Sequence, residues 1–170
     1  MRTSAPTVFL VMGVSGTGKS TIASALASAL AVPFIEGDDY HPAENVTHMA
    51  AGHALTDGMR WPWLDALITA CNAAIDEGTS VVLSCSALKR AYRDHLRAGL
   101  GPIRIIFLDG AYDLLANRMT ARANHFMPTS LLDSQLATLE PPSPNENPIH
   151  IDVAHSVTAI ISQLLEELSS

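Results

Sequence analysis

Residues 13–20 read GVSGTGKS, so glycine, lysine and serine stand at the fixed positions of the pattern G-x-x-x-x-G-K-S. Five apolar residues, 8–12, come directly before this segment and predict a buried strand, and the Ala- and Leu-rich residues 20–31 predict a helix directly after it. In such a strand–turn–helix unit, glycines let successive backbone N–H groups turn inward, and the helix N-terminus adds a partial positive charge. The segment therefore predicts a phosphate-binding loop (P-loop).

The residue types within this loop predict individual roles. Lys19 is expected to reach the β- and γ-phosphates of a nucleotide, and the Ser20 hydroxyl is expected to ligate Mg²⁺. We therefore expect ATP and Mg²⁺ as cofactors. The expected cofactor-binding residues are Gly13, Val14, Ser15, Gly16, Thr17, Gly18, Lys19, Ser20 and Thr21.

Short apolar runs alternate with longer helical segments along the rest of the chain. Further strands are expected at 33–36, 80–85, 103–108 and 149–153, and further helices at 61–77, 87–98, 112–123, 130–139 and 156–168. Continuous apolar strands between helices predict a parallel sheet that is covered on both faces. We expect an α/β, three-layer P-loop NTPase fold with a five-stranded parallel sheet, formed by residues 1–170 as a single domain.

Composition argues against several classes of partner. Ten Lys and Arg against 17 Asp and Glu give a formal net charge of −7, which disfavours general affinity for nucleic acid or an anionic membrane. No apolar run is long enough for a signal-peptide core or a membrane span. Cys71 and Cys85 have no metal-binding spacing and are expected to be buried thiols. We therefore expect a cytoplasmic protein.

The phosphate-binding loop leaves the acceptor of the phosphoryl group open, because GTPases, motor ATPases and small-molecule kinases share it. The guanine-reading motif Asn-Lys-x-Asp is missing from the sequence, and the strand at 80–85 lacks the terminal acid of a Walker B motif. Asp38 and Asp39 instead follow the strand at 33–36. At the carboxyl end of a parallel sheet, Asp38 can accept the proton of an acceptor hydroxyl, although a turn or helix cap is an alternative role. These features favour a small-molecule kinase.

Six blocks in chain order carry a resemblance to a known family: MGVSGTGKS at 12–20; GDDYHP at 37–42 with Asn45 and Met49; LTD at 55–57 with Arg60 and PWL at 62–64; CSALK at 85–89 with YRD at 92–94, Leu96 and Arg97; Arg118 and Arg122 with HFM at 125–127; and SQLATLEP at 134–141. In these blocks the chain resembles gluconokinases of the adenylate-kinase-like P-loop group. The resemblance implies transfer from ATP to the 6-hydroxyl of D-gluconate, a small helical lid at about 118–140, and a possible homodimer. One block departs from the family, because its usual Asp-x-Asp-Arg is Asp57-Gly58-Met59-Arg60 here.

A site for gluconate needs cations for the carboxylate and polar groups for the hydroxyls. The expected substrate-binding residues are Asp38, His41, Arg60, Lys89, Arg93 and His125, with Arg60 pairing with the carboxylate. Arg118 and Arg122 share one helical face and are expected to neutralise charge in the transition state. Together with Lys19 and Asp38 they form the expected catalytic set.

Two alternative functions stay open at this point. The first is a kinase of another small acceptor, such as shikimate or a nucleoside monophosphate, because shikimate kinases share the chain length and the acid after the second strand. The second is a non-catalytic nucleotide-binding regulator, at which only the replacement by Met59 hints.

Overall fold

The computed structural model describes residues 5–53, 55–121 and 129–169. Its elements in chain order are β1 (Val8–Met12), α1 (Lys19–Leu30), β2 (Phe34–Glu36), α2 (Ala43–Ala50), α3 (Asp57–Asp76), β3 (Val81–Ser84), α4 (Arg90–Leu100), β4 (Ile103–Asp109), α5 (Tyr112–Ala121), α6 (Thr129–Thr138), β5 (Ile149–Asp152) and α7 (Val157–Ser169). Short 3-10 turns occupy Gly37–Tyr40 and Pro144–Glu146.

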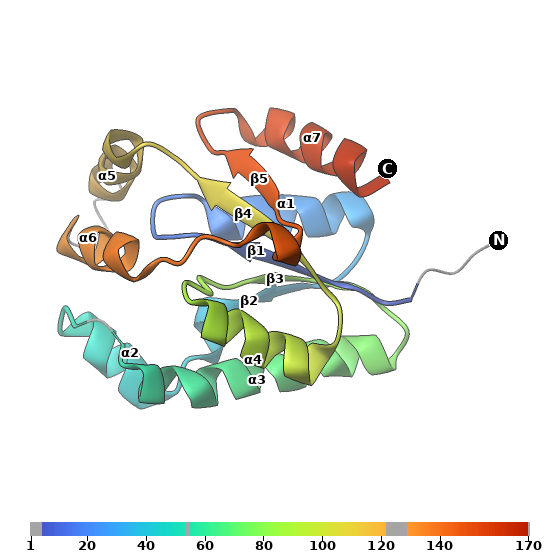
Figure 1. Cartoon of the computed structure of the whole chain (residues 1–170), viewed down its shortest axis with the longest axis horizontal. Coiled ribbons are helices and arrows are strands. Elements are labelled where there is room, and N and C mark those ends of the chain that lie inside the picture. The colour runs from blue at the N-terminus through green and yellow to red at the C-terminus, as the bar shows by residue number, and fades with distance from the viewer. Residues whose placement is uncertain (1–4, 54, 122–128, 170) are drawn as a thin grey trace.

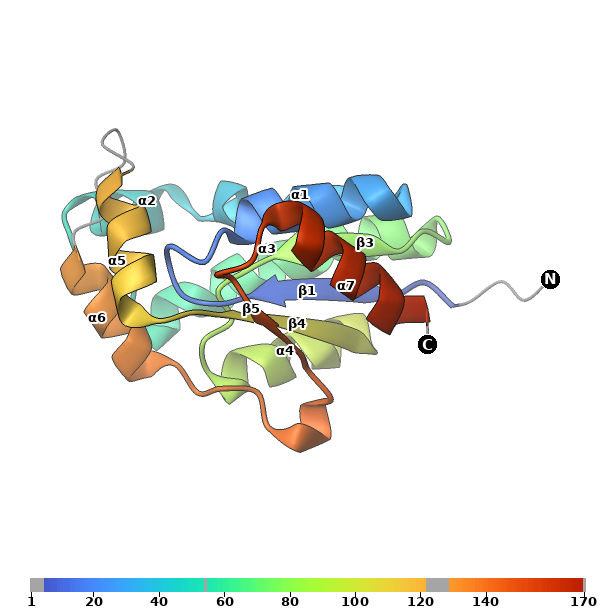
Figure 2. The same cartoon turned by 90° about the horizontal axis from the view of Figure 1, so that it is seen from above.

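The five strands form one parallel sheet in the order β2-β3-β1-β4-β5. Val8 of β1 is paired with Val81 of β3 on one side and with Ile103 of β4 on the other. Helices α1 and α7 cover one face of the sheet, and α3 and α4 cover the opposite face (Figures 1 and 2). The predicted three-layer α/β fold with five parallel strands is confirmed.

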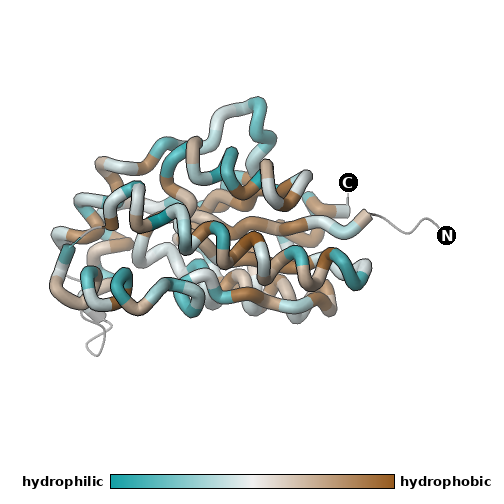
Figure 3. Tube along the Cα trace, turned by 90° about the horizontal axis from the view of Figure 1, so that it is seen from below, coloured by the Kyte–Doolittle hydropathy of each residue, from teal (hydrophilic) through white to brown (hydrophobic). Residues whose placement is uncertain are grey.

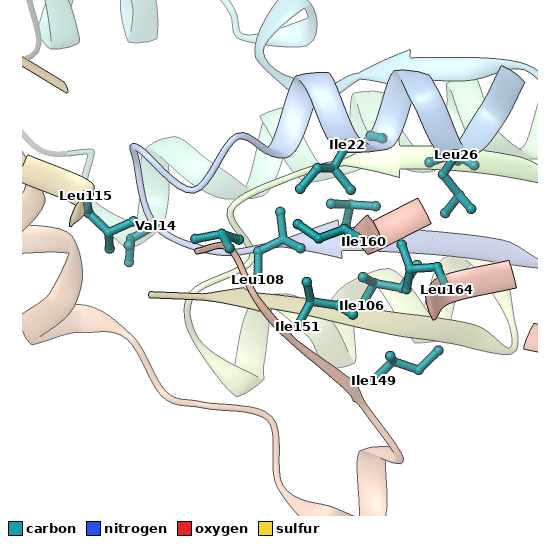
Figure 4. Close-up of a cluster of buried hydrophobic side chains, with 14 of the residues drawn as sticks. Val14, Ile22, Leu26, Ile106, Leu108, Leu115, Ile149, Ile151, Ile160 and Leu164 are labelled. Carbon is teal, nitrogen blue, oxygen red and sulfur yellow. The ribbon is translucent and has the colours of Figure 1, made fainter. Parts of the chain in front are cut away.

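The central strands β1 and β3 are largely buried on both faces, which explains why their sequences are almost continuously apolar, whereas the edge strand β5 alternates buried and exposed residues. In β1, Leu10 belongs to the cluster under α3 and α4, whereas Val11 belongs to the cluster under α1 and α7. Figure 4 shows Ile22 of α1 and Ile160 of α7 in the second of these clusters. The hydropathy-coloured trace of Figure 3 alternates between polar and apolar residues along the outer helices, as expected for helices with one buried face.

One helix, α2, was not expected from the sequence. Its residues AENVTHMA contain no apolar stripe, and its buried residue is the polar Asn45. Helix α3 begins four residues earlier than predicted, because the Thr56 side chain accepts a hydrogen bond from the Met59 N–H and caps the helix. Both differences lie on the side of the molecule that forms the candidate site.

The carboxyl ends of all strands lie at one edge of the sheet, because the strands are parallel. The loop between β1 and α1 leaves this edge, and α2, α5 and α6 gather around the same end of the molecule in both views (Figures 1 and 2). In the part of the chain that the structure describes, no helix combines the length and the apolar character needed to cross a membrane.

Candidate active site

Residues 13–18, between β1 and α1, form a cradle of backbone N–H groups. Gly16 and Gly18 have φ angles of 86° and 83°, a region that favours glycine. A Cβ atom on Gly16 would lie 2.9 Å from the carbonyl oxygen of Leu115, so a side chain would also collide with α5. Gly18 precedes α1 and has no side chain to cap it. The first N–H groups of the helix therefore have no capping side chain and suit an anionic ligand. The backbone therefore fits an anion such as a polyphosphate.

The first two residues of α1 supply the groups that a magnesium nucleotide requires. Lys19 donates from Nζ to the carbonyl oxygen of Val14 at 3.1 Å, which holds the ammonium group over the loop. Ser20 is exposed in the same turn, and its hydroxyl oxygen is a hard ligand of the kind that Mg²⁺ prefers. These residues fit the predicted binding of ATP and Mg²⁺.

A cavity that we call the central pocket opens beside this loop, with a volume of about 80 Å³ for the centres of water-sized molecules. Five of the predicted site residues line it: Ser15, Lys19, Asp38, His41 and Arg60. The other lining residues are Met49, His53, Leu55, Trp63, Ser86, Leu88, Leu131, Ser134, Gln135 and Thr138. The pocket combines apolar side chains with a few polar and charged groups that come from different elements, as small-molecule sites do.

The turn that carries Asp38 is fixed against the end of β3. Gly37 donates its backbone N–H to the Ser84 hydroxyl at 3.2 Å, and its carbonyl oxygen accepts a hydrogen bond from the Trp63 indole at 2.8 Å. A Cβ atom on Gly37 would lie 2.1 Å from the Ser84 carbonyl oxygen, which leaves no space for any side chain there. The sheet and α3 together therefore set the position of Asp38.

The Asp38 carboxylate faces the pocket, with 75% of its side-chain area exposed. Desolvation by the surrounding walls raises the pKa of this carboxyl group, and the charge of Lys19 opposes the increase. Because Asp38 lines the same pocket as Lys19 of the loop, it is suited by position to accept or orient a hydroxyl proton.

His41 is a neutral hydrogen-bond donor in this site. Its ring is stacked on Trp63 at a centroid distance of 4.1 Å, and its side chain is almost fully buried. Burial, together with the charge of Arg60, lowers the pKa of His41 to about 4. The Asn45 Nδ2 group lies 3.3 Å from His41 Nδ1 and also donates to the carbonyl oxygen of Met59. Because that amide group can only donate, Nδ1 accepts and the ring proton lies on Nε2, 3.8 Å from Asp38.

Arg60 is a buried cation at the wall of the central pocket. It is 8% exposed, one of its terminal nitrogens donates to the Leu55 carbonyl oxygen, and its guanidinium group lies 5.1 Å from the centre of the Tyr92 ring. Its Nε is fully buried and has no hydrogen-bond partner among the described residues. Arg60 lines the central pocket, so the charge of its guanidinium group lies at the wall of the site, whereas the buried Nε is out of reach of a ligand there.

Arg118 lies on the other side of the loop, at a second cavity that we call the side pocket. This pocket is lined by Gly16, Thr17, Gly18, Thr21, Ile22, Arg118, Val153, His155, Val157 and Ile160. Arg118 donates to the Val153 carbonyl oxygen at 2.7 Å, which ties α5 to the segment after β5. Two further predicted residues, Arg122 and His125, lie outside the described residues.

A family model described as an AAA domain matches residues 8–142. The thermosensitive gluconokinase of Escherichia coli K12 is 42% identical over 156 residues, which cover 91% of this chain and 83% of that protein. The gluconokinase of Gluconobacter oxydans 621H is 42% identical over 165 residues, which cover 97% and 93%. The chain belongs to the gluconokinase family. A crystal structure of a gluconokinase from Sinorhizobium meliloti 1021 is 44% identical, with a TM-score of 0.83 over 97% of both chains.

The departure of this chain from the usual gluconokinase block, at Met59, leaves the position of Arg60 intact. The Met59 backbone carbonyl accepts from Asn45, and Arg60 is held by the Leu55 carbonyl oxygen and the Tyr92 ring. These contacts orient the guanidinium group without a carboxylate at position 59.

Lys89 forms an ion pair with Asp57 and does not line the central pocket. Its ammonium group lies 3.0 Å from Asp57, which also accepts a hydrogen bond from the Tyr92 hydroxyl. The bond from Tyr92, followed by that from Lys89, lowers the pKa of the Asp57 carboxyl group. Among the described residues that line the central pocket, Lys89 is not included. Its substrate-binding role stays a prediction.

The prediction that Arg93 binds substrate is wrong. The side chain is 1% exposed, and all five of its N–H donors are used within the protein. Two bonds go to the carboxylate of Glu146, and three go to the carbonyl oxygens of Ala87, Leu88 and Glu140. No donor is left for a ligand, so Arg93 fixes the loop at 140–146 onto α4.

Sequence reasoning missed the residues that position others. Trp63 and Gln135 belong to blocks of the gluconokinase resemblance, but their spacing gave no indication of chemistry. Asn45 lies on the unexpected helix α2. The side pocket was also missed, because Arg118 of α5 meets residues 153–157, which are distant from it in the sequence.

Proposed function

We propose that this chain transfers the terminal phosphoryl group of ATP to the 6-hydroxyl of D-gluconate. The names of its curated relatives support this proposal, since proteins at 42% identity over most of the chain are gluconokinases. The observation that carries it is the central pocket, which brings Lys19 of the phosphate-binding loop, Asp38 and the buried Arg60 around one cavity.

Arg60 is suited to recognise the carboxylate of the sugar acid. Its guanidinium group lies at the pocket wall in a largely buried position, where the attraction between opposite charges is stronger than in water. The Nε2–H group of His41 and the hydroxyls of Ser86, Ser134 and Thr138 line the same pocket and suit the hydroxyl groups of gluconate. A neutral acceptor would leave the charge of Arg60 unpaired.

Asp38 is suited to act on the hydroxyl that receives the phosphoryl group. In the proposed step Asp38 accepts the hydroxyl proton, the hydroxyl oxygen forms a bond to the terminal phosphorus, and the bond from that phosphorus to the leaving oxygen of ADP breaks in line. Lys19 and the loop N–H groups stabilise charge on the phosphate oxygens. Mg²⁺, which Ser20 would hold, supplies further neutralisation of the polyphosphate charge. Arg118 and Arg122 are proposed to contribute from the lid at 118–140.

The nucleoside of ATP is proposed to occupy the side pocket. Gly18 and Thr21 of the loop and first helical turn line this pocket together with Arg118, so a nucleotide there would reach the cradle from the side opposite the central pocket. ATP would then extend from the side pocket through the loop, and its terminal phosphate would face Asp38.

The test is an ADP-release assay with purified protein, Mg²⁺-ATP and a panel of acceptors that contains gluconate, other sugar acids, shikimate and nucleoside monophosphates. We expect turnover with gluconate and loss of all transfer in Lys19→Ala. We expect Arg60→Met to raise the KM for gluconate far more than the KM for ATP. Turnover with shikimate and none with gluconate would overturn the proposal, and ATP binding without transfer to any acceptor would favour a regulatory role.

A further inference from the structure

Gln135 of α6 contacts the phosphate-binding loop directly. Its side-chain oxygen accepts a hydrogen bond from the backbone N–H of Ser15 at 2.7 Å, across 120 residues of sequence. Both residues line the central pocket, together with Lys19 and Asp38. The Ser15 N–H is one of the donors of the cradle that suits phosphate oxygens. A carboxamide oxygen therefore holds a donor that a phosphate oxygen also requires.

The position of this contact identifies the phosphate with which Gln135 competes. The side pocket borders Gly16, Thr17 and Gly18, whereas Ser15 and Gln135 border the central pocket on the acceptor side. A nucleotide that enters from the side pocket places its terminal phosphate at the central pocket, where Gln135 lies. Since the carboxamide oxygen carries partial negative charge, it cannot remain against the same N–H beside a phosphate oxygen.

The end of α6 is fixed, so displacement of Gln135 affects the helix itself. Glu140, two residues after α6, donates its N–H to the Leu88 carbonyl oxygen at 2.7 Å and accepts from the Arg90 N–H through its carboxylate. Gln135 lies between this anchor and the start of α6 at Thr129. Loss of the bond to Ser15 frees the polar side of α6 to shift relative to the loop, while Leu132 keeps the helix packed on the core and its C-terminal end stays attached to α4.

We propose that Gln135 is a positioning residue that couples the terminal phosphate of ATP to the placement of α6. Gln135 holds α6 on the loop through Ser15 when no terminal phosphate is bound, and the terminal phosphate of ATP displaces it. This inference rests on the proposed function only in that the nucleotide binds at the loop. The bond to Ser15 thus lowers the affinity for ATP and makes α6 respond to the arrival of the phosphate that is transferred.

The experiment measures binding of ADP and of a non-hydrolysable ATP analogue by calorimetry with Mg²⁺ and without acceptor. Gln135→Met keeps the side-chain length and removes the acceptor atom, so we expect the ATP analogue to bind about two- to tenfold more tightly, the worth of one hydrogen bond. Gln135→Glu strengthens the acceptor and adds negative charge. We therefore expect the ATP analogue to bind at least about tenfold more weakly. We expect a smaller effect on ADP in both variants.

The matched controls are Gln163→Met and Gln163→Glu on α7, which make the same changes at a side chain that lines neither pocket and are expected to alter neither affinity. Thermal unfolding shows whether each variant is folded. The proposal predicts that the two Gln135 substitutions change the affinity for the ATP analogue in opposite directions. Unchanged or weaker analogue binding in Gln135→Met would overturn the proposal, and so would equal losses for ADP and the analogue in Gln135→Glu. Because no acceptor is present, these results are independent of whether gluconate is the substrate.

A second measurement follows α6 itself by hydrogen–deuterium exchange. In the wild-type protein, the ATP analogue is expected to change exchange in residues 129–138, and ADP is expected to change it less. Gln135→Met is expected to show the changed exchange before nucleotide is added. If exchange in α6 is the same with and without the analogue, the coupling is refuted.

Discussion

Replacing Arg93 by methionine separates a structural role from a substrate-binding role. The substitution removes five hydrogen bonds and leaves Glu146, whose side chain is 1% exposed, without its main partner. Burial alone would raise the pKa of Glu146, but the bonds from Arg93, the Ser143 N–H and Arg97 lower it to about 2. The carboxylate is therefore charged at neutral pH, and it depends on these partners for its stability in the folded protein.

Loss of one partner of a buried ion pair destabilises proteins by about 3–5 kcal/mol. Glu146 keeps Arg97 at 2.9 Å and the Ser143 N–H at 2.9 Å, so we expect the lower end of this range, about 3 kcal/mol. In a chain of this length, that loss lowers the midpoint of thermal unfolding by about 6–12 °C. Thermal unfolding measures this shift, and an activity assay measures the KM for gluconate.

The control is Arg90→Met, because Arg90 has the same side chain on the same helix but is 41% exposed. Its ion pair with Asp94 is solvated and its pair with Glu146 is long, at 3.9 Å, so we expect a loss of about 1 kcal/mol. Arg93→Met should lower the unfolding temperature far more than the control, with an unchanged KM for gluconate in the protein that is folded. A raised KM with an unchanged unfolding temperature would refute the structural role.

Three further predictions concern the central pocket. Asp38→Asn should lower kcat far more than ATP affinity. The acid limb of kcat/KM in the wild type, which the raised pKa of Asp38 shifts upward, should disappear in this variant. The pKa of His41 is lowered to about 4, so the free energy of unfolding should fall as the pH decreases from 6.5 toward 4. In His41→Gln, denaturant titrations at several pH values should show a smaller change of the unfolding free energy over this range. Gly37→Ala should destabilise the fold by about 3 kcal/mol and reduce kcat, because its Cβ would lie 2.1 Å from a carbonyl oxygen, whereas Gly58→Ala, with open space around its Cβ, should be tolerated.

The phosphate-binding loop and the layered fold could be predicted because their causes are local in sequence. Residues 13–20 contain the glycines, lysine and serine that the loop needs, and the continuous apolar strands report burial on both faces. The placement of Asp38 beside Lys19 also followed, since the carboxyl ends of parallel strands lie at one edge. Helix α2 could not be predicted, because its buried residue is Asn45 and no apolar stripe marks it.

The sequence by itself determined which chemistry this protein can carry out, namely the binding of a polyphosphate and the presence of a carboxylate next to it. Only the tertiary structure decided which cations lie at the pocket. Arg60 and Arg93 are equally charged in the sequence, yet Arg60 lines the central pocket, whereas all donors of Arg93 are bonded within the protein. The physical reason is that long-range contacts decide which donors are already bonded within the protein. The contact of Gln135 with Ser15 could not be predicted for the same reason, because it joins residues that are 120 positions apart in the sequence.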